Sequence, residues 1–165
     1  MRRCDILKRP QRSKEEQLDS VIIRSLEPSD NRDWRRLWSE YLAFYEVTRP
    51  PSVYESTWRR LLIKDEFEPK CLLAFVQGKA VGLVHYLYHR SCWSVSNSCY
   101  LQDLFTDPVA RGKGIGGALI EAVREEAAKI GVINVYWMTQ ETNATARRLY
   151  DRVARKTGFI EYDLT

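Results

Sequence analysis

The stretch LFTDPVARGKGIGGAL, residues 104–119, constrains the fold and function of this chain more than any other. The chain has eight glycines, and half of them lie within six residues here: Gly112, Gly114, Gly116 and Gly117. Two cations, Arg111 and Lys113, lie among them. Glycine loses more conformational freedom on folding than any other residue, so this concentration needs a local reason.

The position of the glycines indicates a phosphate site. A β-forming run ends near Thr106, and a helical pattern begins near Gly114. The first turn of a helix presents unpaired N–H groups and a partial positive charge, which favour anions. Glycines let a phosphate approach the backbone, and the two cations add full charge. We therefore predict a phosphate or pyrophosphate site; the alternative is a glycine-rich turn that only packs tightly.

The order of the secondary-structure patterns predicts the fold class. A strand, two helices and a three-strand meander are followed by a helix, a strand, a helix and a closing strand. A strand–helix–strand crossover implies local parallel pairing. We expect an α/β (α+β) fold with a mixed, mostly antiparallel sheet of six to seven strands and about four helices. The expected strands are 21–26, two within 70–89, 99–106, 132–139 and 158–164; the expected helices are 30–46, 53–64, 114–130 and one capped by Asn143.

Length and composition limit the domain count and the partners. The 165 residues favour one domain, over 21–165, preceded by a polar tail over 1–20 that we expect to be flexible. No apolar run approaches the ~20 residues of a membrane span, so no membrane partner is expected. The net charge of the chain is +4. The tail alone holds six cationic and four anionic side chains, so half of this charge belongs to the tail. This balance is too weak to make nucleic acid the expected partner.

The cysteines and histidines predict neither a disulfide framework nor a metal site. The cysteines form no CxxC pair, which favours reduced thiols and a cytoplasmic location. His85 and His89 are four apart on a predicted strand, whereas the HxxxH zinc pattern belongs to helices. The four cysteines are Cys4, Cys71, Cys92 and Cys99.

Residues 112–117 also match the dinucleotide-binding pattern G-x-G-x-x-G, and Glu141 imitates its ribose-binding acid. That fold, however, runs its first strand almost directly into the glycines. Here the polar segment TDPVAR intervenes and a hairpin meander comes before it. A Walker A loop is excluded because no Gly-Lys-Ser/Thr occurs.

The segment RGKGIG resembles the acyl-CoA signature of the GNAT acetyltransferases, Arg/Gln-x-x-Gly-x-Gly/Ala. NATARRLY is similar to the Asn-x-x-Ala-x-x-x-Tyr pattern of that family, through Asn143, Ala146 and Tyr150. The resemblance covers about residues 21–163. Within the family, the chain resembles the small fungal histone-and-other-protein acetyltransferases and the diamine (spermidine/spermine) acetyltransferases.

The resemblance implies a set of roles around acetyl-CoA. The central strands would be splayed apart by acetyl-CoA, whose thioester and pantetheine would meet the backbone of Leu104, Phe105 and Thr106. The Leu104 N–H would stabilise the oxyanion, and Tyr150 would be the general acid, although its helical spacing also fits a core aromatic residue. Asn143 would assist in binding the cofactor, and a homodimer or higher oligomer is implied. The pyrophosphate would meet the amides of Arg111, Gly112, Lys113, Gly114, Ile115 and Gly116.

On the acceptor side, the chain departs from the diamine enzymes. Gln102 stands where those enzymes have a glutamate, and an amide cannot take a proton. The candidate carboxylates are Asp103, Glu141 and Glu46, or water relays the proton. Regular strand alternation would direct Gln102 and Asp103 to opposite faces, so Asp103 has either a structural or a substrate-orienting role.

Three further residues are candidates for the substrate side of the cleft. The resemblance implies that Tyr45 and Glu46 lie there, and Glu46 can alternatively be a solvated helix-end acid. Trp93, in a strand connection, either walls the site or only packs. The function we expect is acetyl-CoA-dependent N-acetylation of a primary amine of a small molecule such as a polyamine or an amino acid. The alternatives are a protein lysine or N-terminal acetyltransferase and, more remotely, a non-catalytic acyl-CoA or dinucleotide-binding module.

Overall fold

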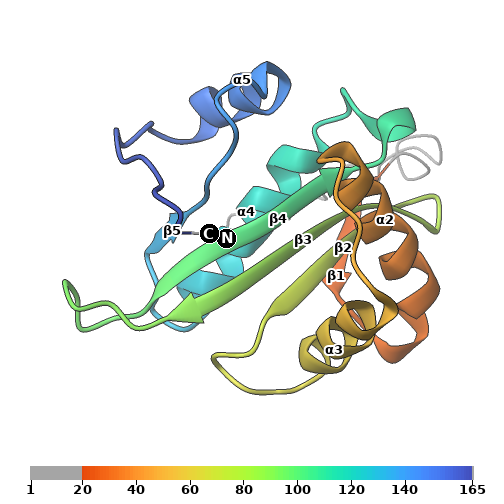
Figure 1. Ribbon diagram of the computed structural model, residues 1–165, viewed down its shortest axis with the longest axis horizontal. Helices are drawn as coiled ribbons and strands as arrows, with labels where there is room; N and C mark the ends of the chain where they lie inside the picture. Colours follow the sequence, from red (N-terminus) through yellow and green to blue (C-terminus); the bar gives the residue numbers. More distant parts are fainter. Residues whose placement is uncertain (1–19, 165) are drawn as a thin grey trace, which may run out of the picture.

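The computed structural model describes residues 20–164, and its centre is a five-stranded sheet in the order β1-β2-β3-β4-β5. The first four strands pair antiparallel, and β5 runs parallel to β4 (Figure 1). The parallel pair is possible because a helix crosses over between the two strands. The strands are β1 (Ile22–Ser25), β2 (Lys70–Val76), β3 (Lys79–His89), β4 (Ser98–Thr106) and β5 (Asn134–Tyr136).

Helices cover both faces of the sheet. α2 (Asn31–Phe44) and α3 (Pro51–Leu61) lie on one face, and α4 (Ile115–Lys129) lies on the other (Figure 1). α5 (Ala144–Val153) follows β5 and contacts α4. Short 3-10 turns at Pro28–Asp30 and Pro108–Ala110 precede α2 and α4.

Two apolar clusters hold these layers together. On the α4 face, Val84 of β3 packs with Leu119 and Val123 of α4. On the α2 face, Leu83 of β3 packs with Trp34 of α2. Leu83 and Val84, adjacent in β3, thus point to opposite faces of the sheet and belong to different clusters, as strand alternation requires. The predicted mixed α/β fold is therefore confirmed.

The end of the chain differs from the expectation. The sheet has five strands rather than six to seven, and the predicted closing strand over 158–164 has no regular structure. β5 is also shorter than the predicted run 132–139. A strand needs a neighbouring backbone for its ladder, and the described residues supply none beyond Tyr136 or along 158–164. The predicted tail lies, except for Ser20, outside the described residues.

Among the described residues, no helix is long and apolar enough to cross a membrane.

Candidate active site

The candidate site begins where β4 and β5 part. β5 pairs only with Ser98–Tyr100 at the start of β4, and the chain after Tyr136 then rises away from β4 towards α5 (Figure 1). The second half of β4, residues 101–106, therefore pairs on its β3 side and has no β5 partner within residues 20–164. The predicted divergence of the central strands is present.

The start of α4 can bind an anion. No oxygen of residues 20–164 accepts a hydrogen bond from the amides of residues 112–117. The N-cap residue, Gly114, offers no side chain, and the first turn of α4 holds no acidic residue that could neutralise the helix dipole. Free amides and an uncompensated dipole at one place favour a phosphate ligand.

The four glycines have two different tasks. Gly112 and Gly114 adopt φ of +79° and +80°, a region that only glycine enters without strain, and a Cβ on either would meet open space. Gly116 and Gly117 instead lie against α5, since a Cβ at Gly116 would come within 3.2 Å of Leu149. The predicted phosphate site therefore concerns the first pair, which leaves room for a ligand, whereas tight packing explains the second pair.

Three elements converge at Gly116. A Cβ there would lie 3.7 Å from Thr106 Oγ1 of β4, opposite Leu149 of α5. Arg111 folds back, and its Nε donates to the Thr106 carbonyl at 3.1 Å. Asn143 caps α5 by accepting from the Ala146 amide at 3.1 Å, so its side-chain oxygen is committed to the helix.

Tyr150 of α5 lies half-buried in the same region. Its ring contacts Trp137, with 5.3 Å between centroids, and it packs against the α4-side cluster. Burial raises the pKa of Tyr150 to about 12, and the nearby Tyr45 hydroxyl adds to the rise. The phenol is therefore protonated at neutral pH, and Tyr45, at the end of α2, is close enough to influence it.

A series of contacting polar and aromatic side chains leads from Tyr45 into the α2 face of the sheet. Tyr41 lies one turn before Tyr45, with 5.1 Å between ring centroids. Burial raises the pKa of the Tyr41 hydroxyl strongly, with a further rise from the neighbouring Asp103 carboxylate. Asp103 Oδ2 accepts a hydrogen bond from His85 Nδ1 at 2.8 Å, and His85 Nε2 accepts one from Trp34 Nε1 at 2.8 Å.

A β-bulge at Gln102 corrects the expected orientation of β4. His85 pairs with Asp103, whereas the next residue, Tyr86, pairs with Leu101, so Gln102 is an extra residue. Leu101 belongs to the α4-side cluster, while Asp103 meets His85 on the α2 side. The alternation that placed Gln102 and Asp103 on opposite faces is broken at this point. Gln102 itself is exposed.

Two predicted substrate residues lie at the surface. Trp93 is 92% exposed in the β3–β4 connection, so the alternative that it only packs is wrong in this structure, while its role as a wall of the acceptor site stays a prediction. Glu46 is exposed directly after Tyr45, at the end of α2. His89 hydrogen-bonds to the Tyr136 hydroxyl and to a backbone carbonyl. No metal-binding group of three or more side chains occurs in the described part of the chain.

Four contributors were not predicted from the sequence: Tyr41, His85 as a polar partner, Trp34 and Thr139. Thr139 lies three residues beyond β5, and its hydroxyl is buried without a partner among residues 20–164. Such orphaned groups are rare. This one belongs to the segment that leaves β4, where a ligand between the parted strands could supply the missing bond.

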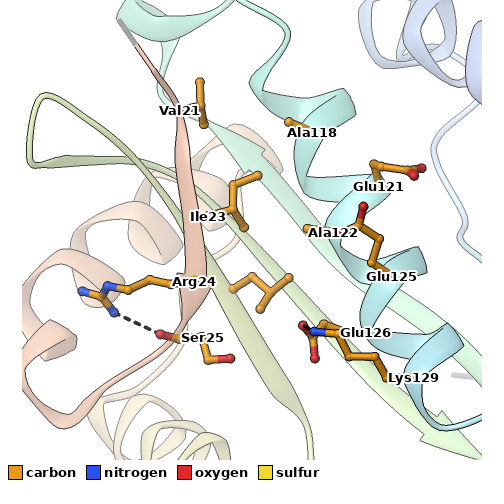
Figure 2. A pocket seen from close by; sticks show the side chains of 11 residues that line it. Val21, Ile23, Arg24, Ser25, Ala118, Glu121, Ala122, Glu125, Glu126 and Lys129 are labelled. Atoms are coloured by element: carbon orange, nitrogen blue, oxygen red, sulfur yellow. Dashed lines mark hydrogen bonds and ion pairs between the residues drawn. The ribbon is translucent and has the colours of Figure 1, made fainter. Parts of the chain in front are cut away.

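A groove of about 420 Å³ lies elsewhere, between β1 and α4 (Figure 2). Its floor is apolar, and Glu121, Glu125, Glu126 and Lys129 of α4 form its rim. Glu121 pairs with Arg124 and Glu126 with Lys129, so most of this acidity is neutralised on the helix itself. The groove contains none of the predicted site residues.

Comparisons with known proteins agree with this geometry. Residues 34–154 match the family described as "Acetyltransferase (GNAT) family". This chain belongs to the GNAT acetyltransferases and is an N-acetyltransferase.

Named relatives and a solved structure share the resemblance over most of their length. The chain is 38% identical to the D-amino-acid N-acetyltransferase HPA3 of Saccharomyces cerevisiae, over 87% of this chain and 90% of that protein. It is 29% identical to the thialysine N-epsilon-acetyltransferase of Mus musculus, over 79% and 81%. The ribosomal-protein-alanine N-acetyltransferase structure from Brucella melitensis biovar Abortus 2308 matches with a TM-score of 0.72, over 88% of this chain and 99% of that chain. At 22% identity, that structure is similar in fold alone.

The family uses acetyl-CoA, and the residues present fit it. The free amides at the start of α4 suit a pyrophosphate, and the parted strands expose the β4 backbone beyond Tyr100. The orphaned Thr139 hydroxyl offers a further bond in the same gap. When bound, acetyl-CoA would supply the activated acetyl group, and these residues would bind and orient it.

Proposed function

We propose that this enzyme acetylates the amine of a free amino acid or of a closely similar small molecule. The observation that carries this proposal is the 38% identity to a D-amino-acid N-acetyltransferase over nearly the whole chain. The relative named for thialysine points in the same direction. The acceptor side presents three uncharged polar side chains, Tyr41, Tyr45 and Gln102, beside only two carboxylates, Glu46 and Asp103. That charge suits one ammonium group better than the several of a polyamine.

The proposed chemistry needs proton transfers that these residues can perform. The amine arrives mostly as an ammonium ion, and it must lose a proton before it attacks the thioester. The Leu104 N–H would donate to the carbonyl oxygen as negative charge develops there. Tyr150 would donate to the departing sulfur.

The raised pKa of Tyr150 limits how far that donation goes. A thiol has a pKa near 8.5, about 3.5 units below the value of about 12 for Tyr150, so complete proton transfer to a thiolate would be uphill by about 5 kcal/mol. Tyr150 would therefore stabilise the sulfur by hydrogen bonding and pass on a proton only as the amine releases one.

Glu46 is the proposed negative group at the entrance. Its backbone stands in the left-handed region, at φ 57°, directly after α2. The Glu46 N–H donates to the Ala43 carbonyl and the Val47 N–H to the Leu42 carbonyl, which is the Schellman pattern that normally ends in glycine. A glutamate held at strain beside Tyr45 supports a functional role.

We also propose a homodimer in the cytoplasm. Large apolar side chains are exposed along β5 and the end of the chain, including Ile133, Phe159 and Tyr162. Such a concentration favours a protein interface. Cys71, Cys92 and Cys99 are free thiols, in keeping with a reducing compartment. Light scattering on the purified protein would test the dimer, and a monomer at micromolar concentration would exclude it.

The function is tested by thiol release from acetyl-CoA with a panel of acceptors. The panel contains D- and L-amino acids, thialysine, ornithine, spermidine and a lysine-containing peptide. We expect the highest kcat/KM with an amino-acid amine. Turnover with the peptide alone would instead make the enzyme a protein acetyltransferase, and turnover with spermidine alone would make it a polyamine enzyme.

A further inference from the structure

The buried chain Trp34–His85–Asp103 connects the aromatic core to the acceptor side. The three side chains come from α2, β3 and β4, and the two hydrogen bonds that join them are both 2.8 Å long. Trp34 is fully buried, His85 is 4% exposed and Asp103 is 8% exposed. Asp103 lies one residue before Leu104, so it borders the gap between the parted strands.

Trp34 determines where the hydrogens lie in this series of hydrogen-bonded side chains. An indole N–H can only donate, so His85 Nε2 must be the acceptor and carries no hydrogen. The hydrogen of a neutral imidazole is then on Nδ1, which donates it to Asp103. A second hydrogen, on Nε2, would point at the Trp34 N–H and would break that hydrogen bond. His85 is therefore oriented with Nε2 as the acceptor from Trp34 and Nδ1 as the donor to Asp103.

Three ionisable groups besides His85 lie near Asp103 and are uncharged at neutral pH. Tyr41 of α2, Tyr100 of β4 and Cys71 of β2 face it, and burial raises the pKa of each above its ordinary value. No lysine or arginine forms an ion pair with Asp103 within residues 20–164. Among residues 20–164, the Asp103 carboxylate thus has hydrogen-bond partners but no cationic side chain beside it, which leaves an ammonium group of the acceptor as its possible counter-ion.

We propose that Asp103 binds the ammonium group of the acceptor and takes up its first proton, and that His85, fixed by Trp34, is the positioning residue that orients this carboxylate. The bulge at Gln102 supports this role, because it turns Asp103 to the α2 side, where Tyr41 and Tyr45 lie. Asp103, the next residue of the strand, then supplies the carboxylate that the diamine enzymes have at the position of Gln102.

The proton balance is complete with these groups. The ammonium nitrogen loses two protons in all. Asp103 accepts the first and returns it to water. The second leaves the nitrogen as the C–N bond forms and the C–S bond breaks, and it reaches the sulfur through Tyr150, while the C–S electron pair stays on sulfur. This inference rests on the proposed function, namely a small cationic amine as acceptor.

Asp103→Asn is the first test. The asparagine carbonyl still accepts from His85, so the variant removes the charge and keeps the hydrogen bond. We expect amine kcat/KM to fall by about 10²-fold, as for loss of a general base, and the amine Kd to rise at least tenfold. The Kd for acetyl-CoA should change less than twofold, because acetyl-CoA is proposed to bind amides at the start of α4 and backbone groups of β4, which the substitution does not alter.

Trp34→Phe and Trp38→Phe form the second, matched pair. The two indoles stack in one cluster with 5.1 Å between centroids, but Trp38 Nε1 has no partner in the described residues. Only Trp34→Phe frees His85 Nε2 to take a second proton. The ratio of its amine kcat/KM to that of the wild type should fall about tenfold below pH 6.5, the ordinary histidine range. The Trp38→Phe ratio should stay flat with pH.

The outcomes separate the two claims. If wild-type protein binds an amine and Asp103→Asn binds it equally well, the inference is wrong even where the proposed function holds. If no small amine binds or reacts, both fail. If the kcat/KM ratio falls equally below pH 6.5 in both tryptophan variants, the hydrogen bonds of Trp34, His85 and Asp103 have a structural role only. Should Trp34→Phe not fold, amine binding by Asp103→Asn, measured by titration calorimetry, decides alone.

Discussion

Replacing Glu46 by glycine should make the protein more stable and less able to bind its amine. Glu46 has φ 57° at the C-terminal cap of α2, where a side chain costs about 1–2 kcal/mol. Glycine relieves this strain but gives the unfolded chain about 0.4–1 kcal/mol more entropy. The net gain is about 0.5–1 kcal/mol, or roughly 1–4 °C in Tm for a chain of this size.

The charge is a separate part of the same experiment. Glu46 is exposed, so an ammonium contact there is worth only about 0.5–1 kcal/mol, and its loss should raise the amine KM about two- to fivefold. The increase should shrink at high salt, where exposed charges are screened. The kcat should change less, because the contact exists before the chemical step.

Glu46→Gln is the matched control. It removes the charge and keeps the strain, so it should raise the amine KM without raising Tm. Thermal unfolding and steady-state kinetics on both variants give the two answers. A glycine variant with unchanged or lower Tm would refute the strain argument. An unchanged amine KM in both variants would refute the acidic entrance.

Three further predictions concern Tyr150 and the bulge at Gln102. Tyr150→Phe keeps the packing volume and removes the donor, so kcat should fall by roughly 10²-fold with little change in the Kd for acetyl-CoA; wild-type turnover would return Tyr150 to the core. Stability of the wild type should fall as pH rises from 10 to 12, because the Tyr150 phenol ionises near 10 when unfolded and only at about 12 when folded. In alkaline denaturation Tyr150→Phe should lose about 2–3 kcal/mol less than the wild type, and equal losses would contradict the argument. Gln102→Glu should move the acidic limb of the pH–rate profile if a base at the bulge can act, and an unmoved limb would leave Asp103 as the base.

The parts of the fold that follow from local sequence were predictable. The spacing of Trp34, Leu37 and Trp38 predicted the buried face of α2. The turn at Gln77-Gly78 has φ of 50° and 75°, as a tight hairpin requires. The glycine loop also lies at a helix start, as its composition indicated.

The parts that depend on distant neighbours were not predictable. The bulge at Gln102 exists only relative to β3, and it reverses the faces that simple alternation assigns. His85 meets Trp34 across 51 positions of sequence, and no local pattern marks that contact. The closing strand over 158–164 was expected from β-propensity alone, but a strand also needs a partner, which the structure does not give it.

Acetyl-CoA binding at the start of α4 is the central claim, and titration calorimetry on a matched pair of variants tests it most directly. Gly114 and Gly78 have φ of +80° and +75°, and a Cβ on either meets open space, so aspartate strains both equally. Gly114→Asp also places a negative charge where the pyrophosphate would bind. The account predicts that Gly114→Asp abolishes measurable acetyl-CoA binding while Gly78→Asp binds like the wild type. Wild-type affinity in a folded Gly114→Asp protein would contradict it.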